Sequence, residues 1–171
     1  MTKLEIRDTS LNGVKLIVPP TIFEDFRGSY VETYNRDLYK SGGITQDFIQ
    51  DDISTSTKGV LRGIHGDHQT TKLVSCLQGS FYLVVVNNDE SSDEFGKWES
   101  FTISDQNRLQ VLIPAKFGNG HLVLSETAIF HYKQTTAYNR ESQFTIMWDD
   151  PNHNIWWPIK NPILSRRDAG L

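Results

Sequence analysis

The chain has 171 residues, of which 37% are hydrophobic and 11% aromatic, a composition typical of a globular protein and not of a disordered one. This length is enough to bury a sizeable core, so a single domain over residues 1–171 is expected. The formal net charge of −4, without any block of like charge, argues against nucleic-acid binding as the main task.

The first segment, residues 1–18, contains no apolar signal region. No apolar run anywhere in the chain approaches the roughly 20 residues that a helix needs to cross a bilayer. We therefore expect a cytoplasmic protein without a membrane partner.

Short runs rich in Val, Ile, Phe, Tyr and Thr follow one another along the chain, separated by Gly, Asn, Asp, Ser or Pro. This pattern predicts closely spaced β-strands. Gly79 should lie at the turn of a hairpin, and residues 35–43 should form a short helix closed by glycines. Residues 156–171 read as a Pro-punctuated coil whose two tryptophans pack against the body. The expected strand regions are 14–19, 28–34, 72–87, 97–104, 108–114, 121–126, 128–135 and 143–150.

Eight or more strands in one domain predict an all-β fold: a β-sandwich, a jelly roll or a barrel. The single cysteine, Cys76, excludes an intrachain disulfide and a cysteine-rich zinc site. It lies in the apolar segment KLVSCL, so we predict a buried, inert thiol and not a nucleophile.

The segment LRGIHGDHQTTKLV, residues 61–74, places two histidines between runs that read as strands. His65 and His68, joined by His121 from a distant segment, are one candidate metal site. Against it, residues three apart on a strand point to different faces unless the chain bends.

Acid–base chemistry is the second interpretation of this segment. Cations near His65, such as Arg62 and Lys72, would keep its imidazole neutral and able to accept a proton. Such a histidine needs a carboxylate to fix its tautomer. Tyr132, in FHYKQTTAY, could donate a proton from another side, although a tyrosine in a strand is more often a packing residue.

Two arginines beside glycines, Arg27 and Arg62, could bind a phosphate through their guanidinium groups. The alternative for each is a salt bridge on the rim of the fold. No Walker motif or dinucleotide-binding glycine pattern is present.

Several motifs occur in an order that resembles the dTDP-4-dehydrorhamnose 3,5-epimerase family. They are FEDFRGSYVE, FIQDDISTS, GVLRGIHGDHQTTKLV, FGKWESFTIS, QVLIPAKFGNGHLVLSE, IFHYKQTTAY, WDDPNHNIWWP and PILSRRD, and they span residues 14–168. The resemblance implies a cupin-type jelly-roll barrel, generally homodimeric, that works without a metal or another cofactor. It also implies inversion of a carbon beside the C4 ketone of a nucleotide-diphospho-4-keto-sugar, as in surface polysaccharide synthesis.

The resemblance implies a role for each matching residue. His65 would be the general base, paired with Asp168, while Tyr132 would be the acid on the opposite face and Lys72 would stabilise the enolate. The residues implied to bind the substrate are Phe23, Arg27, Glu32, Gln50, Arg62 and Tyr138.

The chain departs from the family at the expected sugar end of the pocket. GFAHGF reads KFGNGH, so Asn119 replaces a histidine and His121 appears two residues later; both remain candidate substrate contacts. The QxN motif reads QDD, residues 50–52, and Asp67 and His68 become candidate specificity residues.

These departures leave the substrate open between a dTDP-6-deoxyhexose and a GDP-heptose. They also leave open whether C3 alone or both C3 and C5 are inverted. Two alternatives share the fold: a 3,4-ketoisomerase, and a non-catalytic cupin that binds a metal.

Overall fold

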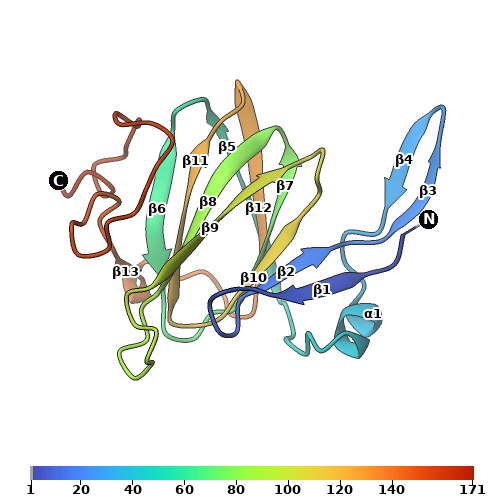
Figure 1. Cartoon of the computed structure of the whole chain (residues 1–171), viewed down its shortest axis with the longest axis horizontal. Coiled ribbons are helices and arrows are strands. Elements are labelled where there is room, and N and C mark those ends of the chain that lie inside the picture. Colours follow the sequence, from blue (N-terminus) through green and yellow to red (C-terminus); the bar gives the residue numbers. More distant parts are fainter. Residues whose placement is uncertain (1) are drawn as a thin grey trace.

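The computed structural model describes residues 2–171 and confirms the predicted all-β jelly-roll class (Figure 1). One sheet has six strands, in the order β1 (Glu5–Asp8), β2 (Lys15–Val18), β10 (Gln110–Ile113), β7 (Lys72–Gln78), β12 (Thr127–Gln134) and β5 (Gln50–Thr57). The other has five, in the order β13 (Phe144–Thr145), β6 (Leu61–Gly66), β11 (Phe117–Val123), β8 (Ser80–Asn87) and β9 (Trp98–Ser104). All the strand pairs within both sheets are antiparallel.

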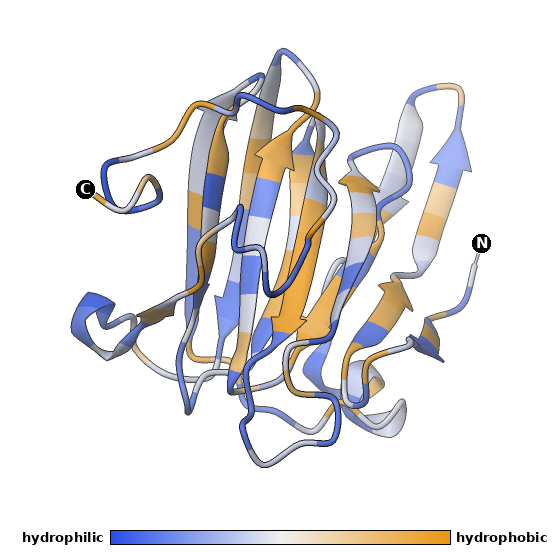
Figure 2. Ribbon diagram, turned by 60° about the vertical axis from the view of Figure 1, so that its left-hand side comes forward, coloured by the Kyte–Doolittle hydropathy of each residue, from blue (hydrophilic) through white to orange (hydrophobic). Residues whose placement is uncertain are grey.

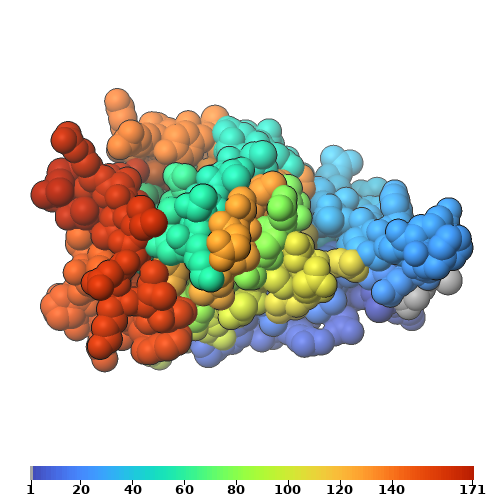
Figure 3. All heavy atoms as spheres, turned by 90° about the horizontal axis from the view of Figure 1, so that it is seen from above, coloured from blue at the N-terminus to red at the C-terminus, as the bar shows by residue number. Residues whose placement is uncertain are grey.

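A separate two-stranded hairpin projects away from the two sheets, at the opposite end from the C-terminal coil (Figures 1 and 3). It consists of β3 (Thr21–Asp25) and β4 (Gly28–Val31). The predicted short helix, α1 (Arg36–Ser41), follows it and ends at Gly42 as expected, and Asn35 is its N-cap. A short 3-10 helix, η1 (Arg140–Ser142), follows β12.

The strand β8 explains why the run FYLVVV is hydrophobic at every position. Its odd-numbered residues 81, 83 and 85 pack into the core between the two sheets, where Val74 and Phe130 also lie. Its even-numbered residues 82, 84 and 86 pack on the outer face of the five-stranded sheet, where residues 144–164 cover them. A strand that is buried on both faces loses the alternation of polar and apolar residues. Figure 2 shows the hydrophobic residues gathered on the central strands and the connecting loops mostly hydrophilic.

The strand predictions hold for most of the chain, with Gly79 at the β7–β8 turn at φ +76°. The prediction that both tryptophans of the tail pack against the body holds for one of them. Trp157 is buried against the five-stranded sheet, whereas Trp156 is largely exposed. The predicted strand 143–150 is wrong over most of its length, because only Phe144 and Thr145 pair with β6. Within residues 2–171, no helix is long and apolar enough to span a membrane.

Candidate active site

A cavity of about 450 Å³ opens between strands of both sheets and the C-terminal coil. Its size falls within the range of small-molecule binding sites. It gathers side chains that are far apart in the sequence, from β5, β6, β7, β11, β12, η1 and residues 163–168. Eight of the residues predicted from the sequence line the cavity: Arg62, His65, Lys72, Asn119, His121, Tyr132, Tyr138 and Asp168.

His65 and Asp168 form the central pair of the cavity. The Nε2 atom of His65 lies 2.8 Å from Oδ1 of Asp168, and neither atom has another hydrogen-bonding partner among residues 2–171. Asp168 is only 4% exposed. Burial alone would raise the pKa of its carboxyl, but the contacts with His65 and with the Ser165 hydroxyl outweigh burial and hold that pKa below its ordinary value. A carboxylate in this position fixes the tautomer of the imidazole and stabilises its protonated form.

The backbone of the C-terminal coil brings Asp168 to this position. Ile163 donates its amide to the Gly59 carbonyl, and its own carbonyl accepts from the Leu61 amide at the start of β6. Ser165 then fixes the carboxylate, because its hydroxyl donates to Oδ2 of Asp168 at 2.8 Å. The coil is therefore attached to the strand that carries His65.

The strand β6 places both Arg62 and His65 on the cavity wall although they are three residues apart. Opposite β6, Asn119 pairs with His65 and His121 pairs with Arg62, so three steps along β6 match two along β11. This bulge supplies the bend that the sequence alone could not show. Gly63 lies inside it at φ +117°, and a Cβ atom there would meet the Gly120 Cα at 2.5 Å. Only glycine fits this backbone.

Lys72 is a buried cation on the opposite wall. Its Nζ atom donates to Oδ1 of Asn119 at 3.0 Å and lies 5.9 Å from the centroid of the Tyr132 ring. Burial lowers the pKa of Lys72 to about 8, an effect that nearby Asp67 opposes. The ammonium can therefore bear a charge at neutral pH while remaining close to losing it.

Tyr132 on β12 and His121 on β11 both line the cavity. Burial raises the pKa of Tyr132 to about 12, with a further contribution from Asp52, so its hydroxyl is a donor over the physiological range. His121 stacks on Phe130, with ring centroids 4.1 Å apart. Burial, followed by the charge of Arg62, lowers the pKa of His121 to about 3. His121 is therefore a neutral imidazole and cannot carry a proton in an acid–base cycle near neutral pH.

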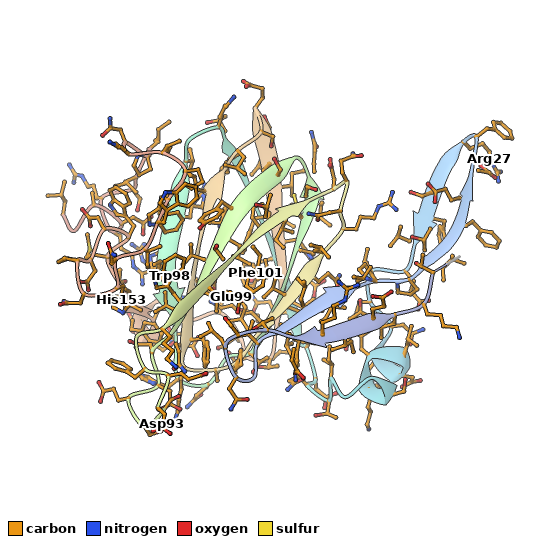
Figure 4. The ribbon with its side chains drawn as sticks, viewed as in Figure 1. Arg27, Asp93, Trp98, Glu99, Phe101 and His153 are labelled. Atoms are coloured by element: carbon orange, nitrogen blue, oxygen red, sulfur yellow. The ribbon has the colours of Figure 1, made fainter. Side chains whose placement is uncertain are left out.

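Three candidate substrate residues lie outside the cavity of their own chain. Phe23 belongs to the projecting hairpin, Glu32 follows it, and Arg27 lies at its tip, as Figure 4 shows. The Arg27 guanidinium pairs with Asp25 on the same hairpin. None of the three lines the cavity of the chain that carries it, because the hairpin points away from the body; their role in substrate binding stays a prediction.

Gln50 stands behind the cavity wall and does not form part of its surface. Its side chain donates to Oδ2 of Asp52 at 2.8 Å and accepts from the Tyr138 amide at 3.0 Å. Gln50 thus supports two lining residues and is not itself exposed in the cavity.

The two candidate specificity residues also lie outside the cavity. Oδ1 of Asp67 accepts from the amides of Gln69 and Thr70, so its carboxylate caps a turn. The His68 ring packs near Phe144, with centroids 5.8 Å apart. Their positions argue against direct substrate contact. They also contradict the three-histidine metal site, and no cluster of three potential metal-binding side chains occurs within residues 2–171.

Two arginines that line the cavity were not predicted from the sequence, and Asp52, noted there only as a departure from the QxN motif, lines it as well. Arg167 is held by Thr145 and Gln143, Arg140 belongs to η1, and Asp52 lies on β5. Arg167 directly precedes Asp168 in LSRRD, so the motif already contained a signal. Arg140 had none, because it lies in a polar segment with no apolar neighbour.

A buried base–carboxylate pair, a buried cation and a phenol surrounding one cavity can remove a proton from carbon and stabilise the resulting oxyanion. A family model described as dTDP-4-dehydrorhamnose 3,5-epimerase matches residues 8–171. The chain belongs to this family. The predicted family, its cupin-type fold and its isomerase class are thereby confirmed.

Individual relatives agree with the family match. A protein of Methanothermobacter thermautotrophicus named dTDP-4-dehydrorhamnose 3,5-epimerase is 36% identical, over 98% of this chain and 93% of its own length. A Neisseria gonorrhoeae protein of the same name is 40% identical over 96% of this chain, which spans 51% of that relative. The crystal structure of a Legionella pneumophila dTDP-6-deoxy-D-glucose-3,5-epimerase with dTDP-4-keto-L-rhamnose superposes with a TM-score of 0.92 and 39% identity, covering 98% of this chain and 90% of that one.

Proposed function

We propose that this chain inverts C3, C5 or both beside the C4 ketone of a nucleotide-linked 4-keto sugar. The observation that carries the proposal is the convergence of the His65–Asp168 pair, Lys72 and Tyr132 on one cavity. His65 removes the proton from the carbon beside the ketone. The electron pair moves to the C4 oxygen, where Lys72 stabilises the enolate. Tyr132 then donates a proton to the opposite face, which inverts the carbon.

The anionic end of the substrate fits the arginines of the cavity. Arg62 is held by a hydrogen bond from its Nε to the Ser56 hydroxyl at 2.9 Å, and Arg140 and Arg167 line the same space. Guanidinium groups bind diphosphates through paired hydrogen bonds. We place the diphosphate here and the sugar between His65 and Tyr132.

A dTDP-linked 6-deoxyhexose is the first candidate substrate, because the relatives' names specify dTDP sugars. A GDP-heptose is the second candidate. Asn119 and His121, the departures from the family motif, both line the cavity and would present different polar groups to the sugar. The shift in melting temperature caused by dTDP or by GDP separates the two, since selective binding to the folded state stabilises it.

Solvent exchange tests the reaction itself. In D2O, the parent enzyme with the correct 4-keto nucleotide sugar should introduce deuterium at C3, or at both C3 and C5, and NMR of the product should show inverted centres. His65→Asn should show neither. A product whose ketone has moved to C3 would instead establish a 3,4-ketoisomerase. Absence of exchange with every dTDP- and GDP-linked 4-keto sugar, together with His65→Asn behaving as the parent does, would overturn the proposal.

A second copy of the chain would supply the hairpin residues that the cavity lacks. Phe23, Phe26 and Tyr30 on the hairpin are 64%, 98% and 65% exposed, which is costly for three aromatic side chains on one small element. In a twofold dimer each hairpin can reach the other copy's cavity, with Arg27 at the diphosphate and Phe23 and Glu32 at the nucleoside.

Mixed dimers test this arrangement. Arg27→Ala and His65→Asn should each be inactive alone. After denaturation and refolding together in equal amounts, they should recover about a quarter of the parent activity, because half of the dimers then contain one intact site. If Arg27 acts in its own chain's site, every site of a mixed dimer is defective, and absence of recovery would contradict the exchange of hairpins. Arg62→Ala refolded with His65→Asn is the control, because both residues line the cavity of one chain and this pair should recover no activity.

A further inference from the structure

Asp52 introduces a carboxylate directly across from Tyr132. The two residues are paired in register between β5 and β12, and both line the cavity. Directly opposed residues of an antiparallel pair have neighbouring side chains on the same face.

The Asp52 carboxylate is fixed from behind by two amide side chains. Its Oδ2 atom accepts from Gln50 Nε2 at 2.8 Å and from Gln134 Nε2 at 3.1 Å. Gln134 is buried, and Gln50 is itself held by the Tyr138 amide. Both of these hydrogen bonds end on Oδ2, so they fix the carboxylate without using Oδ1.

Three ionisable groups surround the Tyr132 phenol. Asp52 faces it from β5, Tyr138 from the segment after β12, and the Lys72 ammonium lies over its ring from β7. Burial is the largest cause of the raised pKa of Tyr132, and Asp52 is the next. A phenolate formed beside a carboxylate is disfavoured by repulsion between like charges.

We propose that Asp52 is a positioning residue that acts through Tyr132 and limits how often an exchanged substrate carbon is inverted. The inference rests on the proposed function. After His65 has taken the proton, the enolate has two fates. His65 can return a proton or a solvent deuteron to the same face, which gives exchange with retention. Alternatively, the Tyr132 O–H bond breaks, its proton joins the opposite face of the carbon, and the phenolate that remains regains a proton from solvent as the imidazolium loses one. Asp52 disfavours the phenolate and therefore favours the first fate.

Two isosteric substitutions on β5 test this role. Asp52→Asn removes the charge and retains the shape, while Asp51→Asn makes the same change one residue earlier. Asp51 is a matched control because it lies on the other face of β5, paired with Lys133 at 2.7 Å. Parent, both variants and Tyr132→Phe are incubated with the 4-keto nucleotide sugar in D2O, and NMR gives the rates of exchange and inversion at each carbon.

We expect Asp52→Asn to raise the ratio of inversion to exchange about threefold or more, because the Tyr132 phenol becomes a stronger acid without the neighbouring negative charge. KM should stay within about twofold of the parent, and the inversion rate should begin to fall at a lower pH. Asp51→Asn should match the parent, and Tyr132→Phe should exchange without inverting. An unchanged ratio in Asp52→Asn, or a ratio that falls towards that of Tyr132→Phe, would overturn the role of Asp52. Absence of exchange in the parent would instead refute the proposed function.

Discussion

Replacing Lys72 with methionine should stabilise the fold while it removes activity. Burial lowers the pKa of Lys72 from 10.5 to about 8, with nearby Asp67 opposing the change. This lowering means that the charged form costs about 3 kcal/mol more in the folded chain than in the unfolded one. Methionine fills a similar space without a charge, but leaves Oδ1 of Asn119 without its donor, at a cost of about 1 kcal/mol. At pH 7 we expect a net increase of about 1–3 kcal/mol in the free energy of unfolding.

The gain in stability of Lys72→Met over the parent should depend on pH. Between pH 8 and 10.5 the unfolded chain holds a proton at Lys72 that the folded chain has lost. The free energy of unfolding of the parent therefore rises with pH across this window. The advantage of Lys72→Met should be full below pH 8, shrink through the window and vanish above it.

Urea denaturation of both proteins at a series of pH values measures the effect. Lys133→Met is the control, because the Lys133 ammonium pairs with Asp51 outside the cavity and its loss should give no gain at pH 7. A Lys72→Met protein that is less stable than the parent at pH 7, or whose advantage is constant from pH 7 to 10, would refute the reasoning. Its kcat should fall by on the order of 10²–10³, since the enolate loses its cation.

Three further changes have defined outcomes. Gly63→Ala should lower the free energy of unfolding by at least about 2 kcal/mol, because the new Cβ would clash with Gly120 and because Gly63 has a φ of +117°. A denaturation curve equal to that of the parent would contradict this. Asp168→Asn should lower kcat on the order of 10²-fold or more. It should also reduce the parent's loss of stability as the pH falls below 3.8 through the lower folded-state pKa of Asp168, as acid denaturation would show. Cys76, whose pKa burial raises to about 11, should react with iodoacetamide far more slowly in the native protein than in urea, and equal labelling rates would show that it is accessible.

The sequence predicted most of the strands that pack into a core, and it missed β1, β3 and β5, whose residues are mostly exposed or half-buried. The run 72–87 was clear because its residues pack into two cores. The strand β5 was missed because the half-buried and buried residues of QDDISTST are all polar and its single large apolar residue, Ile53, is exposed, so it carries little hydrophobic signal. The strand at 143–150 was overestimated, because apolar residues such as Ile146 and Trp148 pack as coil on the outer face of the sheet.

The order of the motifs predicts which residues belong to the active site, but it does not predict how they come together in space. His65, Lys72, Tyr132 and Asp168 follow from the resemblance, but their convergence depends on the β6 bulge and the coil, neither of which has a periodicity. The role of the hairpin residues stays a prediction, because a motif matched along a chain does not say whether a residue serves its own copy's cavity or that of another copy. The sequence showed Asp52 as a departure from the family motif. That it lies opposite Tyr132 follows only from the register of β5 against β12, which the sequence does not reveal.

The two halves of the catalytic pair belong to parts of the molecule with unequal resistance to local opening. His65 lies in β6, which is bonded along both edges, by β11 and by β13. Asp168 lies in coil that reaches β6 through the backbone bonds of Ile163. Heating should release this coil before the sheets separate, since loosely bonded segments open at lower free energy than central strands. Inactivation would then precede unfolding on a temperature scale, and cooling would restore the pair without refolding of the barrel.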